Sequence, residues 1–316
     1  MSSVVRKQSQ VGVETRPGRR SALFKEMAAH KICYLFLAPY AILFIVFTVV
    51  PVVMAILLSF TYFNMLQPPQ WIGLHNYIRL FLEDDIFLIA VKNTLVYATI
   101  TGPVSYLLSF VTAWLINELK PKARAFLTLL FYAPSISGNA YMIWRIIFSG
   151  DTYGIINGFL MYWGFIDAPV QWLLNPDYIM PLVILVVLWM SMGTGFLVFI
   201  AGLQGIDPRL YEAGAIDGVR NRWQELWYLT LPQMRGYLMF GAIITITSSF
   251  TVAGEISNLV GFPSTDYAAH TIVQHLQDYG SIRFDMGYAS AIAVILFFMM
   301  VVTQRVVQKL LNKVGE

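Results

Sequence analysis

The stretch Tyr211–Pro232 reads YEAGAIDGVRNRWQELWYLTLP and lies between two long apolar runs, residues 178–206 and 236–254. The two runs have the length and composition of helices that cross a lipid bilayer. The stretch between them instead combines acids, arginines and tryptophans, and it closes on Leu-Pro. Its meaning depends on how many times the chain crosses the membrane and on which side this stretch lies.

Composition indicates that lipid is the main solvent of this chain. Of its 316 residues, 57% are hydrophobic and only 12% are charged, whereas a soluble globular chain carries about 25% charged residues. The net charge of +3 is too small to indicate a nucleic-acid partner. Cys33 is the single cysteine, which excludes a disulfide within the chain and a cysteine-based metal site.

Six segments are predicted to cross the membrane as helices, because each offers about 20 or more residues without a charged side chain. The first is too long for the apolar core of a signal peptide, so we expect a retained anchor. Pro39, Pro51 and Pro103 predict kinks within their helices. The predicted fold class is therefore an all-α membrane protein with six transmembrane helices. The segments are residues 32–60, 93–117, 125–144, 178–206, 236–254 and 286–304.

The distribution of lysine and arginine predicts which side each link faces, because these residues concentrate in cytoplasmic loops. Most of the 21 lie in the N-terminal tail, in the links that follow the second and fourth segments, and at the C-terminal end. The alternate links hold only Arg79 and Arg283. Six crossings with both termini in the cytoplasm satisfy every link, so the quoted stretch is predicted to be cytoplasmic.

The predicted organisation has three parts. A cytoplasmic tail covers residues 1–30, a six-helix domain covers 31–310 with a cytoplasmic loop at 207–232, and a cytoplasmic C-terminal end covers 311–316. The outer link 150–177 is long and aromatic. We expect short interfacial helices there, because tryptophan and tyrosine prefer the depth of the lipid headgroups.

The cytoplasmic stretch has the local signals of two short helices. Asp207 is suited to cap the first helix and Pro208 to its first turn, and Gly218 can take a positive φ and end it. A second helix is predicted over Asn221–Tyr228, stopped by Leu231-Pro232. A helix pair of this size is not stable alone, so it needs a partner surface. The alternative is an amphipathic link lying on the anionic inner leaflet.

The stretch resembles the "EAA" signature of permease subunits in ABC importers, in which a Glu-Ala-Ala group, an Asp-Gly pair and a Leu-Pro pair follow one another. Two further segments, WIGLHNYIRLF at 71–81 and LWMSMGTGFLVFIAGLQGIDPRLYEAG at 188–214, are similar to the first permease of the maltose type. The sequence departs from the signature by one extra residue before its Leu-Pro end. The matching positions are Glu212, Ala213, Asp217, Gly218, Leu231 and Pro232, with Gly214 in place of the third small residue.

The resemblance implies a carbohydrate ABC importer of type I, in which this chain is a non-catalytic subunit of the bacterial inner membrane. The stretch would be the coupling helix that docks on a separate ATP-binding subunit, with Glu212 paired to a cation and Trp223 as an anchor. The implied partners are a second permease, two ATP-binding subunits and an extracytoplasmic solute-binding protein. ATP and Mg²⁺ would bind the ATP-binding subunits, because no lysine here has the sequence context of a P-loop.

Polar and aromatic residues at membrane depth are the candidates for the substrate pathway. The resemblance places sugar near two groups of hydroxyl residues, although serine and threonine in membrane helices also bond to their own backbone. Arg145 could line the pathway or extend to the outer interface, and Glu255 could face a water-filled cavity or mark the point where its helix leaves lipid. The other candidates are Asn139, Tyr141, Trp144, Trp189, Ser191, Thr194, Ser248, Ser249 and Thr251.

The expected substrate is an oligosaccharide. Lys92, Arg145 and Arg283 lie at outer depth and would suit an anionic chain such as alginate or another uronate, although they also suit helix-end packing. No metal site is expected, because His270 and His275 are five residues apart and do not share a helical face.

Three alternatives stay open on the residues alone. The acidic triplet 83–85 could hold Ca²⁺, or it could be a solvated loop or helix start. The chain could be an ion-coupled secondary sugar transporter, although Glu255 is the one candidate acid and lies near a helix end. An integral-membrane enzyme is disfavoured because no paired acids or metal-binding motif accompany the triplet.

Overall fold

The structure is a computed structural model that describes residues 30–312. Most of the predicted tail and the end of the predicted C-terminal part lie outside the described residues. The chain divides into two compact units, residues 1–54 and 55–316.

The first predicted segment is one helical run from Lys31 to Leu58. It consists of α2 (Lys31–Phe44), a π-helical turn η1 (Ile45–Val49) and α3 (Val50–Leu58). Pro51 cannot donate a backbone hydrogen bond, so the carbonyl one turn before it has no α-helical partner. The π-turn lies at this position, as π-bulges do where the α-helical ladder is interrupted.

The second unit is helical apart from one two-residue antiparallel ladder, in which Thr61 pairs with Trp71 and Tyr62 with Gln70. Within the described residues this ladder is the departure from the predicted all-α class. The elements are β1 (Thr61–Tyr62), β2 (Gln70–Trp71), α4 (His75–Leu82), α5 (Asp85–Asn117), α6 (Pro121–Ile136), α7 (Ala140–Ile147), α8 (Ile155–Tyr162), α9 (Pro176–Met190), α10 (Thr194–Gln204), α11 (Pro208–Ile216), α12 (Arg222–Gln224), η2 (Glu225–Thr230), α13 (Leu231–Gln233), α14 (Arg235–Phe250), α15 (Gly254–Val260), η3 (Thr265–Tyr267), α16 (Ile272–Gln277), η4 (Asp278–Ile282) and α17 (Met286–Leu311).

Helices occupy all six predicted segments, but not always as single helices. Among the described residues, four helices are long and apolar enough to cross a membrane, and α14 with α15 makes a fifth candidate that is bent by 46°. The third segment was predicted as one helix over 125–144, and this is wrong: α6 ends at Ile136 and α7 begins at Ala140. Short helix α8 confirms helical structure in the link 150–177.

The breaks fall where small and polar residues follow one another. Ser-Gly-Asn separates α6 from α7, and Ser-Met-Gly separates α9 from α10. Glycine costs helical stability, and serine competes for helical carbonyls. Ser191 does so directly, because its hydroxyl donates to the carbonyl of Leu188 at 2.6 Å.

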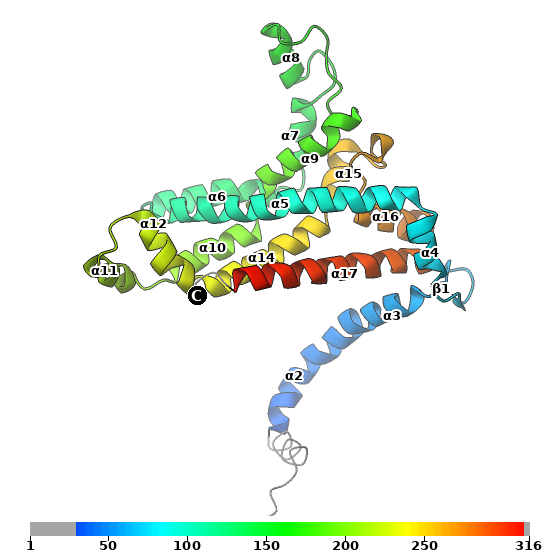
Figure 1. The fold of residues 1–316 in the computed structure, drawn as a ribbon, viewed down its shortest axis with the longest axis horizontal. Helices are drawn as coiled ribbons and strands as arrows, with labels where there is room; N and C mark the ends of the chain where they lie inside the picture. Colours follow the sequence, from blue (N-terminus) through cyan, green and yellow to red (C-terminus); the bar gives the residue numbers. More distant parts are fainter. Residues whose placement is uncertain (1–29, 313–316) are drawn as a thin grey trace, which may run out of the picture. The chain divides into compact units, whose positions relative to one another are not determined.

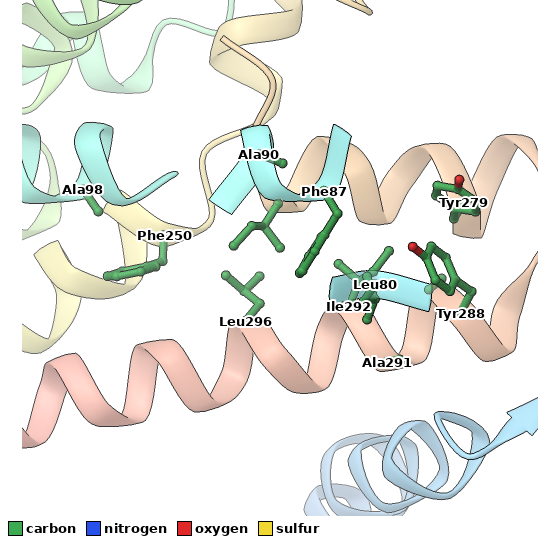
Figure 2. Close-up of a cluster of buried hydrophobic side chains, with 12 residues drawn as sticks. Leu80, Phe87, Ala90, Ala98, Phe250, Tyr279, Tyr288, Ala291, Ile292 and Leu296 are labelled. Atoms are coloured by element: carbon green, nitrogen blue, oxygen red, sulfur yellow. The ribbon is translucent and has the colours of Figure 1, made fainter. Parts of the chain in front are cut away.

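One apolar core of the second unit joins α4, α5, α14 and α17 (Figure 2). Phe87 and Ala90 from α5 pack with Leu80 from α4, Phe250 from α14 and Ile292 from α17, all of them buried. Burial of a large apolar side chain stabilises a soluble fold by about 1.5–3 kcal/mol. Where lipid is the alternative solvent, close packing takes a larger share of that role.

The long helices α5, α10, α14 and α17 place two groups of short elements far apart (Figure 1). At one end, α11 and α12 follow α10, and at the other end β1, α4 and α16 lie beside the starts of α5 and α17. Glycine allows α10 and α14 to approach closely, since a Cβ on Gly241 would come within 2.6 Å of the Phe199 ring. The second unit therefore has two separate surfaces joined by continuous helices.

Candidate functional site

Helix α11 has the predicted start and end. The Asp207 side chain accepts a hydrogen bond from the backbone N–H of Arg209 at 3.0 Å, and Pro208 occupies the first turn. Gly218 has a φ of +97°, which confirms the predicted turn. The N–H of Val219 donates to the carbonyl of Gly214 at 2.9 Å, the bond expected after a helix that ends on a left-handed glycine.

The second helical segment begins as predicted but does not end as predicted. Asn221 caps it by accepting from the N–H of Gln224 at 2.9 Å. Leu231-Pro232 was expected to stop it, and this is wrong: the helical path continues through η2 and α13 to Gln233. The π-helical turn η2 precedes Pro232, so the proline enters the first turn of α13, where no N–H is needed.

The two segments pack through one narrow contact. Gly214 lies against Leu229, and a Cβ at position 214 would come within 2.6 Å of a Leu229 methyl group. The hydroxyls of Tyr211 and Thr230 are 3.1 Å apart and share a hydrogen bond. This contact covers one face of α11. The opposite face and the turn expose Glu212, Ala213, Asp217 and Gly218.

The two tryptophans of the second segment lie outside its buried face. Leu226 is buried, whereas the side chains of Trp223 and Trp227 are 71% and 64% exposed. Trp223 nevertheless contacts the end of α5, because its ring lies 5.5 Å from that of Trp114. The exposed rings add to the surface that α11 offers to a partner.

An ion pair connects the predicted cytoplasmic module, residues 207–233, to α5, and a hydrogen bond directly after the module joins α14 to α17. Arg222 lies 2.7 Å from Glu225 and 3.4 Å from Glu118, the residue that follows α5. At the start of α14, Arg235 donates to the carbonyl of Asn312, beyond the end of α17, at 2.9 Å. Movement of the module would therefore be transmitted to the ends of α5 and α17.

A second candidate site is a cavity of about 290 Å³ between α5, α9, α10 and α14. Polar side chains from α5, α10 and α14 line it, together with Ser191 after α9, Ser135 of α6 and Tyr141 of α7. The structure brings together six of the predicted pathway residues here. They are Tyr141, Ser191, Thr194, Ser248, Ser249 and Glu255.

Most of the cavity hydroxyls bond to their own helices, which is the alternative considered from sequence. Ser248 donates to the carbonyl of Ile244, Ser249 to that of Thr245, and Thr101 to that of Tyr97, each at 2.8–2.9 Å. A hydroxyl that donates to its own backbone still has lone pairs for another donor. The cavity wall is therefore rich in acceptors, which suits a ligand with many O–H groups.

Four further lining residues on α5 escaped the sequence interpretation. They recur every fourth position, so they occupy one helical face at the spacing that marks a polar stripe in an apolar helix. All are buried, which excludes a lipid-facing position. The period was visible in the sequence, and it could have identified Tyr97, Thr101, Ser105 and Ser109.

The other predicted pathway residues lie outside this cavity. The rings of Trp144 and Trp189 pack edge to face at 5.5 Å, and Arg145 lines a separate pocket beside Gln171. Asn139 occupies the position before α7 and makes no cap bond, and Thr251 follows the end of α14.

The acidic triplet contains a buried hydrogen-bonding centre that the sequence did not reveal. Asp84 accepts from Tyr288 at 2.6 Å, from His275 at 3.0 Å and from the N–H of Phe87 at 2.9 Å. Burial raises the pKa of Asp84, but these hydrogen bonds outweigh it and hold the pKa below its usual value. Of the alternatives open for the triplet, the structure supports the helix start, because Asp84 caps α5.

The two histidines meet, contrary to the sequence argument. His270 precedes α16, so helical spacing does not apply to the pair, and its Nε2 lies 3.3 Å from Nδ1 of His275. With both rings neutral, His270 donates to His275 and His275 donates to Asp84. Burial, with the neighbouring His275, lowers the pKa of His270 to about 4.

Comparisons with known proteins identify the family. No protein-family model matches the chain. A probable ABC transporter permease protein of Bacillus subtilis, YesP, is 33% identical over 266 residues, which cover 82% of this chain and 84% of that protein. The permease protein AraP of an arabinooligosaccharide transport system of Bacillus subtilis is 30% identical, with coverage of 93% and 91%.

Solved structures give the same result. A chain from a bacterial ABC transporter involved in the import of the acidic polysaccharide alginate has a TM-score of 0.71 and 25% identity, covering 93% of this chain and all of that chain. A chain of a bacterial alginate ABC transporter, solved with its periplasmic protein bound to an alginate pentasaccharide, has a TM-score of 0.72. The chain described here therefore belongs to the family of carbohydrate ABC transporter permeases, the non-catalytic membrane subunits of these transporters.

Proposed function

We propose that residues 31–310 cross a bacterial inner membrane six times with both termini in the cytoplasm, and that residues 207–232 couple ATP hydrolysis to transport. The distribution of lysine and arginine supports this orientation. In this orientation, the module of residues 207–233 is cytoplasmic and lies where a separate ATP-binding subunit can reach its surface. This arrangement replaces the ion-coupled alternative, because the family uses ATP.

The exposed face of α11 is the observation that carries the coupling role. Gly214 and Tyr211 hold α11 against η2, so Glu212, Ala213, Asp217 and Gly218 stay accessible. The carboxylate of Glu212 suits a cation on the partner, and Gly218 lets a partner backbone approach. When two ATP-binding subunits close, docked modules would be drawn together, a rigid-body switch driven by different contacts in two states.

The proposed assembly contains this chain, a second homologous permease, two ATP-binding subunits and an extracytoplasmic solute-binding protein. The solved alginate transporter bound to its periplasmic protein supports the solute-binding protein as a partner. ATP and Mg²⁺ would bind the ATP-binding subunits, and this chain would bind no cofactor.

The proposed substrate is an oligosaccharide that passes the cavity between α5, α9, α10 and α14. Its acceptor-rich wall suits sugar hydroxyls, and Tyr97 and Tyr141 offer aromatic surface. The lining residues include Glu255 and no lysine or arginine, which favours a neutral sugar at this point. An anionic uronate chain, the alternative suggested by the outer cations, would need cations from the second permease.

Charge reversal at Glu212 tests the coupling role. The full complex is reconstituted in proteoliposomes, and sugar uptake and ATP hydrolysis are measured with neutral and uronate oligosaccharides. Glu212→Lys should leave the chain inserted but abolish uptake driven by ATP. Gln233→Lys adds a positive charge at a position of α13 away from the docking face and is the matched control. Wild-type uptake by Glu212→Lys would refute the proposal.

A further inference from the structure

A groove of about 650 Å³ lies at the end of the second unit opposite α11, beside β1 and α4 (Figure 1). In the proposed orientation this end is extracytoplasmic. The groove is formed by the hairpin that follows β1, by α4 and by the segment between α16 and α17. Its lining residues are Tyr62, Asn64, Met65, Leu66, Arg79, Tyr279, Arg283, Phe284 and Asp285.

Two arginines are held in place along the groove. The Arg79 guanidinium lies 3.0 Å from Asp285 and 4.1 Å from the centre of the Tyr288 ring. The Arg283 guanidinium lies 2.7 Å from Asp278 and 4.5 Å from the centre of the Tyr279 ring. Figure 2 shows these two tyrosines next to each other beside the apolar core. Because the rings and acids fix the guanidiniums, a ligand would lose little side-chain entropy on binding them.

The arginines form the outer layer of these ion pairs. The side chains of Arg79 and Arg283 are 35% and 51% exposed, whereas those of their partners Asp285 and Asp278 are 20% and 18% exposed. Each guanidinium has five N–H donors in a planar fork, and one carboxylate cannot use them all. The groove therefore presents unused donors that suit an acidic group.

Two of the four non-glycine residues with a positive φ among the described residues lie on the rim. Met65 and Phe284 have φ values of +63° and +57°, in the left-handed region that bulky residues rarely enter. The two residues are 58% and 52% exposed. The Asn64 side chain fixes the turn at Met65 by accepting from the N–H groups of Leu66 and Gln67. Strained residues of this kind collect at binding surfaces, where their conformation presents a side chain to a partner.

We propose that this groove docks an acidic, protruding loop of the extracytoplasmic solute-binding protein. The inference rests on the proposed function and adds the place and the chemistry of the contact. A protein fits better than a free sugar because tyrosine, phenylalanine, methionine and arginine, the residues enriched in the centres of protein interfaces, all line the groove. The carboxylate of the loop would bind between Arg79 and Arg283, with Met65 and Phe284 packed against its flanks.

The floor of the groove is connected to α5 and α17. Asp285, the partner of Arg79, also caps α17 by accepting from the N–H of Tyr288 at 3.3 Å. The Tyr288 hydroxyl donates to Asp84, which caps α5. A loop bound at Arg79 would therefore act on the starts of α5 and α17. The far end of α5 contacts the cytoplasmic module, and the far end of α17 is bonded to Arg235, directly after it.

Titration of ATPase stimulation tests the docking site. The full complex in lipid nanodiscs is titrated with its purified, sugar-loaded solute-binding protein, and the half-maximal concentration is measured. Arg283→Gln should raise it by about tenfold or more, as expected for a central interface arginine. Lys92→Gln, which removes a cation outside the groove, should leave it unchanged.

Phe284→Gly separates binding from folding. Glycine removes the backbone strain, so the thermal stability of the complex should be maintained or increased, while the half-maximal concentration rises by about fivefold. Unchanged half-maximal concentrations in both variants, with a responsive wild type, would overturn the docking site alone. A wild-type complex that the binding protein does not stimulate would overturn the proposed function and this inference with it. If the variants changed how ATPase activity depends on the free sugar concentration, and not on the binding-protein concentration, the docking site would also be overturned.

Discussion

Gly218→Ala would test whether the turn after α11 sets the position of the docking face. Gly218 has a φ of +97°, and no atom lies within 4 Å of the position that a Cβ would occupy. The substitution therefore meets no steric contact, and its cost is backbone strain alone. For an L-residue in the left-handed region that cost is about 1–2 kcal/mol.

The expected effect follows from that free energy. A penalty of about 1–2 kcal/mol reduces the population of the native turn by up to about thirtyfold, since each 1.4 kcal/mol is a factor of ten. If docking requires this turn, the apparent affinity of the ATP-binding subunits for the permease pair falls by the same factor. Titration of nanodiscs that hold the permease pair with fluorescent ATP-binding subunits measures this affinity.

The chain contains a matched control for this experiment. A Cβ on Gly236 would also have no atom within 4 Å, but this glycine lies in α14 and has no positive φ. Gly236→Ala should preserve affinity, because alanine is favoured over glycine in a helix. Gly218→Asn should fall between wild type and Gly218→Ala, since asparagine enters the left-handed region more readily. Equal affinities for Gly218→Ala and Gly236→Ala would refute the reasoning.

Two further predictions concern the cavity and the buried histidines. Thr101→Val keeps the side-chain volume and removes a cavity hydroxyl. The KM for sugar uptake should rise about two- to tenfold, which corresponds to the loss of one hydrogen bond. Thr99→Val, on the same helix but outside the cavity, should leave KM unchanged. Folding lowers the pKa of His270 from the usual 6.5 to about 4. The free energy of unfolding should therefore decrease as the pH falls from 6.5 towards 4, because the unfolded chain binds the proton first. The thermal midpoint of the complex should therefore fall less between pH 7 and pH 5 in His270→Gln, and an equal fall in both proteins would contradict this role.

Local signals in the sequence were sufficient for the start and the turn of the cytoplasmic module. Asp207, Pro208 and Gly218 specify the start and end of α11 through hydrogen bonds and φ preferences within a few residues. The apolar segments were equally visible, because a helix in lipid must satisfy its own backbone over its whole length. The same rule could not locate the breaks after Ile136 and Met190, where tertiary packing decides whether short polar runs stay helical.

Sequence by itself determined the membrane class, the helical segments and the turn chemistry of residues 207–218, because these depend on interactions between near neighbours. Only the tertiary structure decided which polar residues meet. Asp84 bonds to His275, 191 positions later, and to Tyr288, 204 positions later. The faces that α5, α16 and α17 turn towards one another create that contact and the adjoining groove, and no local pattern records how those faces pack.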